Sequence, residues 1–298
     1  MDRLYSPTAV KLMQNRHGVQ ASKSLGQNFL VDGNIVDKIV EGAEIREGDL
    51  VLEIGPGMGV ITQAAAEQAA RVVAVEIDKR LIPVLEETLA EFDNVKIIQG
   101  DVLKTDLAAV IEEAKADYGK PFTGVRIMGN LPYYITTPII MGILENFGPT
   151  LGRTEEGLQC VFMVQKEVAV RMAAGPGGKD YGALSVAVSY YSEPELVTDV
   201  SREVFLPRPA VDSAVIRLRV RKEKPVEVKD EKLFFAVVKA GFGQRRKTLL
   251  NSLTGLLGFE KAKVAGILES AGIDGIRRAE TLNLEEFARI ADGFYDAK

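Results

Sequence analysis

Short apolar segments alternate with amphipathic stretches from residue 50 onward. Three of these stretches, "VITQAAAEQAA", "KRLIPVLEETLAEF" and "DLAAVIEEAKADY", carry their apolar residues at helical spacing. The apolar segments are rich in β-branched residues, which is typical of strands. They cover residues 50–55, 71–78, 95–101, 124–130 and 158–165. This alternation predicts a doubly wound, mostly parallel α/β sheet with helices on both faces, whose strands are apolar because both faces are buried.

The pattern changes in the second half of the chain. Residues 183–191 ("ALSVAVSYY") and 212–220 ("DSAVIRLRV") both predict strands with no good helix between them, as expected of an antiparallel edge. Residues 205–211 ("FLPRPAV") hold two prolines and predict a boundary or a rigid crossover. Short helices with glycine stops follow. We therefore predict a large domain over residues 1–207 and a small helical domain over residues 208–298.

Composition excludes several classes of enzyme. Hydrophobic residues make up 46% of the 298 residues and charged residues 27%, so a folded globular protein is expected. Cys160 is the single cysteine, which excludes an internal disulfide and a cysteine-cluster metal site and fits a reducing compartment. His17 is the single histidine, which argues against zinc deaminases, zinc peptidases and Ser-His-Asp hydrolases. Without a signal segment or membrane span, a cytoplasmic protein is predicted.

Charge is distributed unevenly along the chain. The formal net charge is −5, but residues 208–298 contain 18 Lys and Arg against 13 Asp and Glu, a balance of +5. Residues 1–207 contain 19 against 29, a balance of −10. A basic carboxyl-terminal part on an acidic body is compatible with binding a polyanion there, although such a bias also serves solvation.

A glycine-rich turn follows the first strong strand in "VLEIGPGMGVIT". Its glycines are Gly55, Gly57 and Gly59, whereas the dinucleotide fingerprint requires a glycine at the position of Val60, so NAD is disfavoured. The pattern Glu53-x-Gly55-x-Gly57-x-Gly59, with a glycine at every second position, is typical of nucleoside-dependent methyltransferases of the same doubly wound class. Bare backbone at Gly55 and Gly57 lets the amino-acid part of such a cofactor come close.

The next two strands end in carboxylates. Glu76 lies about 20 residues beyond the glycines, where a carboxylate can accept both hydroxyls of a ribose. Asp101 ends the third strand and is placed to accept from an adenine amine. Each carboxylate alone could be a helix cap or a surface charge. Three consecutive strands that end in such groups predict S-adenosylmethionine as the cofactor, with no metal.

The fourth strand ends in "NLPYY", which predicts chemistry on an exocyclic amine. The lone pair of the adenine amine is delocalised into the ring, so an enzyme must orient it toward the methyl donor. The side-chain oxygen of Asn130 and the carbonyl of Leu131, fixed by Pro132, can accept the two amine hydrogens. The ring of Tyr133 can stack on the extruded base. An ordinary turn is the alternative interpretation, because Asn and Pro are turn formers.

These motifs, together with "KSLGQNFL", "GDVL", "FMVQKEVAVRM", "FLPRPAVDSAVIRL" and "FGQRRKTLLNSL", strongly resemble the ribosomal RNA adenine dimethyltransferase family, specifically its bacterial small-subunit type. The resemblance covers roughly residues 21–253. It implies a seven-stranded class I (Rossmann-like) methyltransferase sheet with a small all-α carboxyl-terminal domain. It also implies transfer of methyl groups from S-adenosylmethionine to two adjacent adenosines in a hairpin near the 3′ end of 16S rRNA, giving dimethyladenosines.

The resemblance also implies roles for single residues. Asn28 and Leu30 of "GQNFL" would close over the cofactor, and Gly55 would lie against it. Asn130 would contact both cofactor and target amine, and Tyr133 would stack on the target base. Glu76 and Asp101 keep the ribose and adenine roles given above. Because "KSLGQNFL" precedes the first sheet strand, we expect it to fold back as a lid.

Two basic clusters lie in the carboxyl-terminal part. Arg245, Arg246 and Lys247 are expected at a helix start, where their charge opposes the helix dipole unless an anion compensates. We interpret them as contacts to RNA phosphates. The three arginines of "VIRLRVRK" fall on one face of a strand and are interpreted as a solvated face.

Several alternatives share these motifs. The sister enzymes that modify large-subunit rRNA and confer antibiotic resistance use the same catalytic residues, and only the basic carboxyl-terminal part and "FGQRRKTL" favour the small subunit. A DNA adenine methyltransferase would lack the flanking blocks. A non-catalytic assembly or transcription factor on the same fold would not need the cofactor carboxylates. The expected partner is small-subunit rRNA or a precursor of the 30S subunit, without a membrane, and a monomer is the default.

Overall fold

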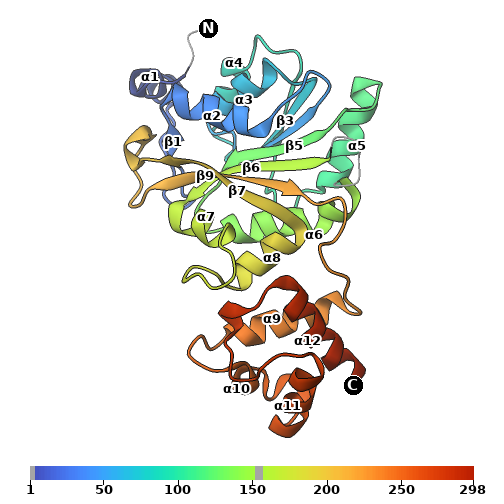
Figure 1. Cartoon of the computed structure of the whole chain (residues 1–298). Coiled ribbons are helices and arrows are strands. Elements are labelled where there is room, and N and C mark those ends of the chain that lie inside the picture. The colour runs from blue at the N-terminus through green and yellow to red at the C-terminus, as the bar shows by residue number, and fades with distance from the viewer. Residues whose placement is uncertain (1–3, 152–156) are drawn as a thin grey trace. The chain divides into compact units, whose positions relative to one another are not determined.

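The computed structural model describes residues 4–151 and 157–298 (Figure 1). A seven-stranded sheet in the order β4-β3-β2-β5-β6-β9-β7 forms its centre. The pairs β4–β3, β3–β2, β2–β5 and β5–β6 are parallel, and β9 is antiparallel to β6. The strands are β2 Leu50–Ile54, β3 Arg71–Glu76, β4 Val95–Gln99, β5 Val125–Asn130, β6 Leu158–Gln165, β7 Ser192–Val200 and β9 Ser213–Val220. The predicted doubly wound, mostly parallel sheet is confirmed.

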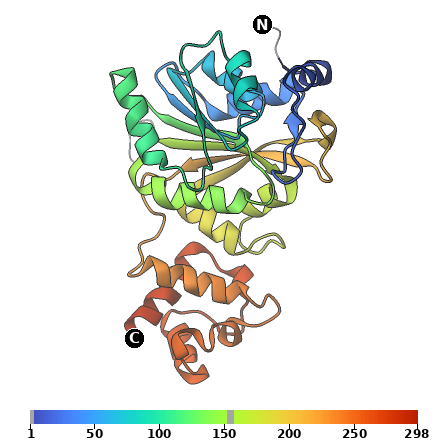
Figure 2. The ribbon, with the colours of Figure 1, turned by 180° about the vertical axis from the view of Figure 1, so that it is seen from behind.

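Helices cover both faces of this sheet. In Figure 1, α2 and α3 lie above the sheet, and from behind α6 runs along the lower face (Figure 2). Asp32 caps α2 by accepting from the backbone N of Asn34 at 2.9 Å, and Gly59 opens α3 directly after the glycine-rich turn. The helices around the sheet are α1 Pro7–His17, α2 Gly33–Ala43, α3 Val60–Ala66, α4 Ile82–Thr88, α5 Leu107–Tyr118, α6 Thr136–Leu151 and α7 Lys166–Met172.

One predicted strand is wrong. Residues 183–191 form helix α8, Ala183–Tyr191, and the edge strand is the following segment, β7, which contains charged residues and Pro194. Five residues of α8 are buried, and its sequence is apolar on nearly all sides. A short apolar run of this kind fits a strand and a buried helix equally well. Proline and charges are common on edge strands, where one side of the backbone is unpaired.

The chain divides into two compact units, but not at the predicted boundary. The first unit contains Met1–Ala169 and Glu193–Lys222, and the second contains Val170–Ser192 and Glu223–Lys298. The boundary at 207/208 is therefore misplaced, because β9 follows it and lies inside the sheet of the first unit. The prolines after residue 205 mark a connection between β7 and β9, in which β8, Phe205–Leu206, pairs with β1, Phe29–Leu30.

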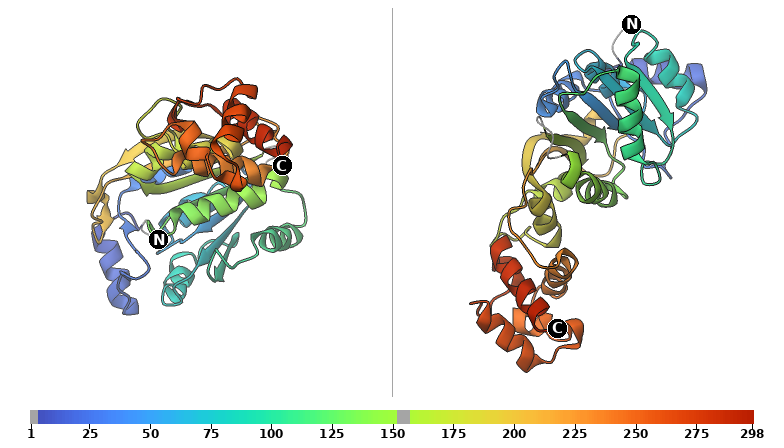
Figure 3. Two further views of the ribbon diagram at one scale, coloured as in Figure 1. Left: turned by 90° about the horizontal axis from the view of Figure 1, so that it is seen from below. Right: turned by 90° about the vertical axis from the view of Figure 1, so that its right-hand side faces the viewer.

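The second unit is helical, as predicted, but it also includes α8 from the middle of the chain. Tyr190 and Tyr191 of α8 pack with Phe234 and Phe235 of α9, and both tyrosine hydroxyls hydrogen-bond Glu231. Figure 3 shows α9 to α12 in orange and red. The helices after residue 223 are α9 Glu231–Phe242, α10 Leu249–Leu253, α11 Lys261–Ser270 and α12 Leu284–Asp296.

The close approach of β5 to β2 generates a prediction about Gly129. A Cβ built there would lie 2.3 Å from the carbonyl oxygen of Ile54, so Gly129→Ala forces two backbones apart. We expect a loss of about 2 kcal/mol or more in the free energy of unfolding, measured by urea denaturation. The control is Gly142→Ala in α6, where an added Cβ meets nothing within 4 Å and stability should stay equal or rise by up to about 1 kcal/mol. Equal stability of the two variants would contradict the packing argument.

Candidate functional site

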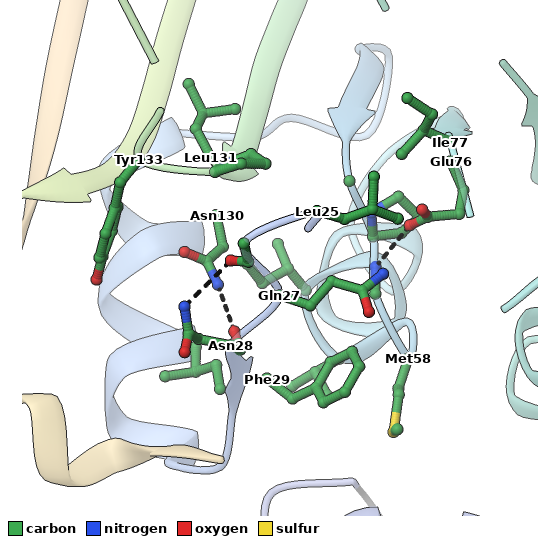
Figure 4. Close-up of a pocket in the computed structure, with 18 residues that line it drawn as sticks. Leu25, Gln27, Asn28, Phe29, Met58, Glu76, Ile77, Asn130, Leu131 and Tyr133 are labelled. Carbon is green, nitrogen blue, oxygen red and sulfur yellow. Dashed lines mark hydrogen bonds between the residues drawn. The ribbon is translucent and has the colours of Figure 1, made fainter. Parts of the chain in front are cut away.

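A pocket lies at the carboxyl ends of β2, β3 and β5, the edge at which parallel α/β sheets bind ligands. It is partly open to solvent, and its empty volume of about 780 Å³ includes that open part. It is lined from four segments far apart in the sequence, within 25–30, 55–61, 76–77 and 130–133 (Figure 4). The predicted site residues that meet here are Asn28, Leu30, Gly55, Gly57, Glu76, Asn130, Leu131 and Tyr133.

The glycine-rich turn forms one wall of the pocket. Gly55, Gly57 and Gly59 have φ angles of +68°, +61° and +88°, which L side chains rarely adopt. A Cβ at Gly57 would also lie 3.3 Å from the ring of Phe29. The alternation of glycines is therefore a requirement of the backbone, and it leaves main-chain atoms facing the pocket.

Glu76 is buried at the end of β3 with 3% of its surface exposed. One carboxyl oxygen accepts from the backbone N of Asp78 at 2.7 Å and the other from that of Gly57 at 3.3 Å. Burial raises the pKa of Glu76 to about 7, against the lowering by these two hydrogen bonds. The carboxylate form is thus incompletely stabilised by the protein alone, and hydroxyl donors from a ligand would complete its hydrogen bonds.

Glu53 lies two residues before the first glycine and is wholly buried in β2. Burial raises its pKa to about 8, and the negative charge of Glu76 adds to the rise. Its Oε2 has no hydrogen-bond partner among the described residues. Glu53 does not line the pocket and therefore makes no direct contact with it.

The orientation of the Asn130 amide is set by the lid segment, residues 23–30. The Nδ2 of Asn130 donates to the backbone oxygen of Asn28 at 2.9 Å, and the Nδ2 of Asn28 donates to that of Gly26 at 3.1 Å (Figure 4). Since the nitrogen of Asn130 is engaged, its Oδ1 remains to accept a hydrogen bond from a ligand. Asn130 is therefore held in the state that an amine-binding role requires.

The turn after Asn130 is held by hydrogen bonds to β6, α6 and β9. The backbone N of Leu131 donates to Met163 in β6 at 3.1 Å, and the hydroxyl of Thr136 donates to the oxygen of Pro132 at 3.0 Å. The Tyr133 hydroxyl is 2.7 Å from the hydroxyl of buried Ser213 in β9. Burial raises the pKa of Tyr133, so this hydroxyl stays protonated at neutral pH. The ring of Tyr133 is thereby fixed at the pocket wall.

The lid segment lines the pocket, as expected, but sequence reasoning missed how it is attached. Gln27 donates from Nε2 to the Oδ2 of Asp78 at 3.0 Å, and its Oε1 accepts from the backbone N of Ser22 at 2.7 Å. The ring of Tyr134, a residue that is 59% exposed, packs against Gly26, because a Cβ built on Gly26 would lie 3.4 Å from that ring. Gln27 lies inside the "GQNFL" motif, but its contact with Asp78 spans 51 residues and therefore leaves no local pattern in the sequence.

Asp101 is not brought into the pocket. It follows β4, where its Oδ1 accepts from the backbone N of Leu103 at 3.0 Å and its Oδ2 lies 3.5 Å from Lys104 Nζ. The link to the site is indirect, through the backbone N of Gly100, which donates to the oxygen of Glu76 at 2.8 Å. Of the predicted cofactor-binding residues, Asp101 alone is absent from the pocket lining.

The basic cluster of the second unit lies in an exposed turn between α9 and α10, and not at a helix start. Helix α10 begins at Leu249 and Thr248 is its cap, so the helix-dipole argument does not apply. Arg245 donates to the backbone oxygen of Lys179 at 2.6 Å and lies 3.7 Å from Glu280. Within residues 4–151 and 157–298, Arg246 and Lys247 have no ion-pair partner. Within this cluster, Arg246 and Lys247 are therefore the two cations not already engaged.

The three arginines of "VIRLRVRK" are ion-paired; Arg217 and Arg219 lie in β9, and Arg221 directly follows it. Arg219, with 44% of its side chain exposed, remains on a solvated face, as interpreted. Arg217, with 12% of its side chain exposed, lies 2.6 Å from Glu44 and 2.5 Å from Glu195. Arg219 contacts the same two carboxylates at 2.9 and 3.0 Å. Arg221 pairs with Glu193 at 2.8 Å. These ion pairs join β9 and the residue after it to β7, and they join β9 to Glu44 at the end of α2.

Comparison with known proteins matches this chain to one family over most of its length. The family model described as "Ribosomal RNA adenine dimethylase" matches residues 18–290. The "Ribosomal RNA small subunit methyltransferase A" of Alkaliphilus metalliredigens (strain QYMF) is 52% identical, with 97% of both chains covered. That of Clostridioides difficile (strain 630) is 49% identical, over 98% of this chain and 97% of the relative.

Solved structures share the fold. The crystal structure of the 23S rRNA methyltransferase ErmE is 28% identical, covers 89% of this chain and 99% of its own, and superposes with a TM-score of 0.66. A dimethyladenosine transferase from Plasmodium falciparum, 24% identical over 88% of this chain and 95% of its own, has a TM-score of 0.72 and supports the fold alone. The sheet is thus that of the class I methyltransferases.

Among residues 4–151 and 157–298, no helix combines the length and apolarity that crossing a bilayer requires. In this same part, no three His, Cys, Asp or Glu side chains are grouped so as to hold a metal ion.

The buried carboxyl of Glu53 generates a prediction about pH. Its pKa is about 8 in the folded protein against an ordinary value of 4.5, so its contribution to stability is complete below pH 4.5 and is lost as the pH rises through 8. Glu53→Gln removes this titration. We expect the stability of the variant relative to wild type to increase by a few kcal/mol between pH 5 and pH 8.5, measured by urea unfolding.

The control is Glu145→Gln, which changes an exposed glutamate of α6 in the same way. That variant should follow the wild-type stability at both pH values. A Glu53→Gln curve parallel to wild type would show that the carboxyl is not desolvated.

Proposed function

Because the chain belongs to the ribosomal RNA adenine dimethylase family, we propose that it transfers methyl groups from S-adenosylmethionine to the 6-amino groups of two adjacent adenosines in small-subunit rRNA. The target is a hairpin near the 3′ end, the products are dimethyladenosines, and the step belongs to small-subunit biogenesis. The observation that carries this proposal is the amide of Asn130, whose nitrogen is bound to the lid and whose oxygen is left for a ligand.

The pocket fits S-adenosylmethionine. The positive φ angles of Gly55 and Gly57 keep bare backbone at its wall, and the buried carboxyl of Glu76 offers acceptors for two ribose hydroxyls. Asn28 and Leu30 cover it from the lid segment. Asp101 remains the proposed acceptor for the adenine amine, as the residue that follows the strand next to Glu76. When bound, the cofactor supplies an electrophilic methyl group on a positively charged sulfur.

The residues of the "NLPY" turn orient the target amine. Asn130 Oδ1 and the carbonyl of Leu131 accept its two hydrogens, which draws the nitrogen toward tetrahedral geometry as positive charge develops there. The Tyr133 ring, held by the Ser213 hydroxyl, stacks on the base. Since the amine proton becomes acidic once the methyl is attached, no general base with a tuned pKa is needed.

Small-subunit rRNA as the substrate is supported by the names of the relatives of similar length. Those near 50% identity over almost the whole chain are named small-subunit enzymes, whereas the 23S enzyme ErmE is 28% identical. We propose that the protein acts as a monomer on a precursor of the 30S subunit, in the cytoplasm where such precursors are found. Arg246 and Lys247, with Arg245, are the proposed contacts to its phosphates.

The role of Asn130 is tested by Asn130→Ala. Without the amide oxygen the amine lone pair is no longer oriented, so methyl transfer should fall by about 10³-fold or more while the protein stays folded. The measurement is incorporation of labelled methyl groups into unmethylated small subunits and into 23S rRNA, with mapping of the labelled base. Asn146→Ala, an exposed asparagine in α6, is the control and should keep wild-type turnover.

Near-normal turnover of Asn130→Ala would remove its catalytic role. Labelling of 23S rRNA in place of the small subunit would transfer the proposed function to the large-subunit class.

The RNA contacts are tested by changing Arg245, Arg246 and Lys247 together to Ala. We expect RNA affinity to fall at least tenfold at low salt and the slope of log K against log salt to flatten by about two, because Arg245 is already engaged by Lys179 and Glu280. Filter binding across a salt series measures both. The control changes three exposed lysines elsewhere, Lys11, Lys120 and Lys222, to Ala. An equal loss of RNA affinity in this control would show that net charge, and not the cluster, is responsible.

A further inference from the structure

The side chain of Gln27 joins the lid segment to the end of β3. Its Oε1 accepts from the backbone N of Ser22 at 2.7 Å, and the backbone N of Gln27 donates to Ser22 O at 3.1 Å, which closes the turn. Its Nε2 donates to Asp78 Oδ2 at 3.0 Å. In Figure 4 the side chain extends across the pocket wall toward Glu76. Both polar atoms of this amide are therefore engaged.

Asp78, the acceptor, also positions Glu76. Its backbone N donates to Glu76 Oε1 at 2.7 Å, and its carboxylate receives the Arg80 guanidinium, with Nε at 2.9 Å and Nη2 at 2.6 Å. Asp78 is 5% exposed. One residue thus holds the carboxyl assigned to the ribose and, through its own side chain, the segment that covers it.

The acceptor is charged throughout the neutral range. The hydrogen bonds from Arg80 lower the pKa of Asp78 to about 2. A hydrogen bond to an ionised acceptor is stronger than one between neutral groups. The contact from Gln27 is therefore stronger than an ordinary amide pair.

The two ends of the lid segment are held differently. Its carboxyl-terminal end is held by the β1–β8 pairing and by the backbone N of Val31, which donates to Val204 O at 2.9 Å. The turn before Asn28 has local backbone hydrogen bonds only, within the described residues, such as Gly26 N to Lys23 O at 3.1 Å. For this half, Gln27 to Asp78 is the hydrogen bond that reaches another element.

We propose that Gln27 is a positioning residue that latches the lid segment over the cofactor pocket through Asp78, so that closure of the lid and orientation of the Glu76 carboxylate are coupled. The proposal rests on the proposed function, because it takes S-adenosylmethionine as the occupant of the pocket. The latch slows release of the cofactor, and its loss acts on cofactor affinity more than on the methyl-transfer step.

The test exchanges the two groups of the latch in the full-length protein, with Gln27→Glu, Asp78→Asn and the double variant. Gln27→Glu sets two carboxylates against each other and should weaken S-adenosylmethionine binding roughly tenfold, with faster dissociation. In the double variant the carboxylate and the amide have changed places, so the hydrogen bond can reform and most of the affinity should return. Calorimetry gives the affinity and stopped-flow the dissociation rate.

Gln20→Glu is the matched control, since it makes the same charge change at an exposed position of the amino-terminal segment, and it should bind as wild type does. Gln27→Met tests the latch without touching Asp78, and it should raise the KM for the cofactor more than it lowers kcat. Wild-type affinity in Gln27→Glu, or a double variant no better than either single one, overturns the latch. Failure of the wild-type protein to bind S-adenosylmethionine overturns the proposed function instead.

Discussion

The close approach of two strand ends, at Gly129 and Ile54, sets the "NLPY" turn beside the glycine-rich turn at the pocket. Strand β5 can pass β2 at this distance only because residue 129 has no side chain. The chain then emerges at Asn130 directly beside the glycine-rich turn, with the lid segment in reach of the Asn130 amide. Segments separated by as many as 102 residues therefore meet at one corner of the sheet.

The electrostatics of this corner suit a positively charged, hydroxyl-rich cofactor. Glu53 and Glu76 are both buried with raised pKa values, and Glu76 relies on backbone N–H groups for its hydrogen bonds. Asp78 is held in the charged form by Arg80 close by. A cationic ligand that brings its own hydroxyl donors relieves the desolvation of Glu76, which supports S-adenosylmethionine over a dianionic dinucleotide at this glycine-rich turn.

The two units divide the work between chemistry and, in our proposal, recognition. The first unit holds the sheet and the pocket, and Arg217 and Arg219 of β9 and the following Arg221 are ion-paired with glutamates. The second unit keeps Arg246 and Lys247 without ion-pair partners among the described residues. Charge available to a polyanion therefore depends on pairing in three dimensions, and the excess of basic residues in the sequence does not by itself locate it.

Most of the sheet and eight of the 18 residues that line the pocket could be predicted from the sequence, because strand periodicity, positive-φ glycines and the "NLPY" turn are local features. The tertiary structure alone decided that residues 183–191 are a helix, that Asp101 lies outside the pocket lining, and that the β9 arginines are paired. It alone also showed that Gln27 reaches Asp78. The physical reason is that burial on all sides removes the polar–apolar contrast that distinguishes a strand from a helix. A hydrogen bond across 51 residues likewise depends on the folded backbone and not on its neighbours in the chain.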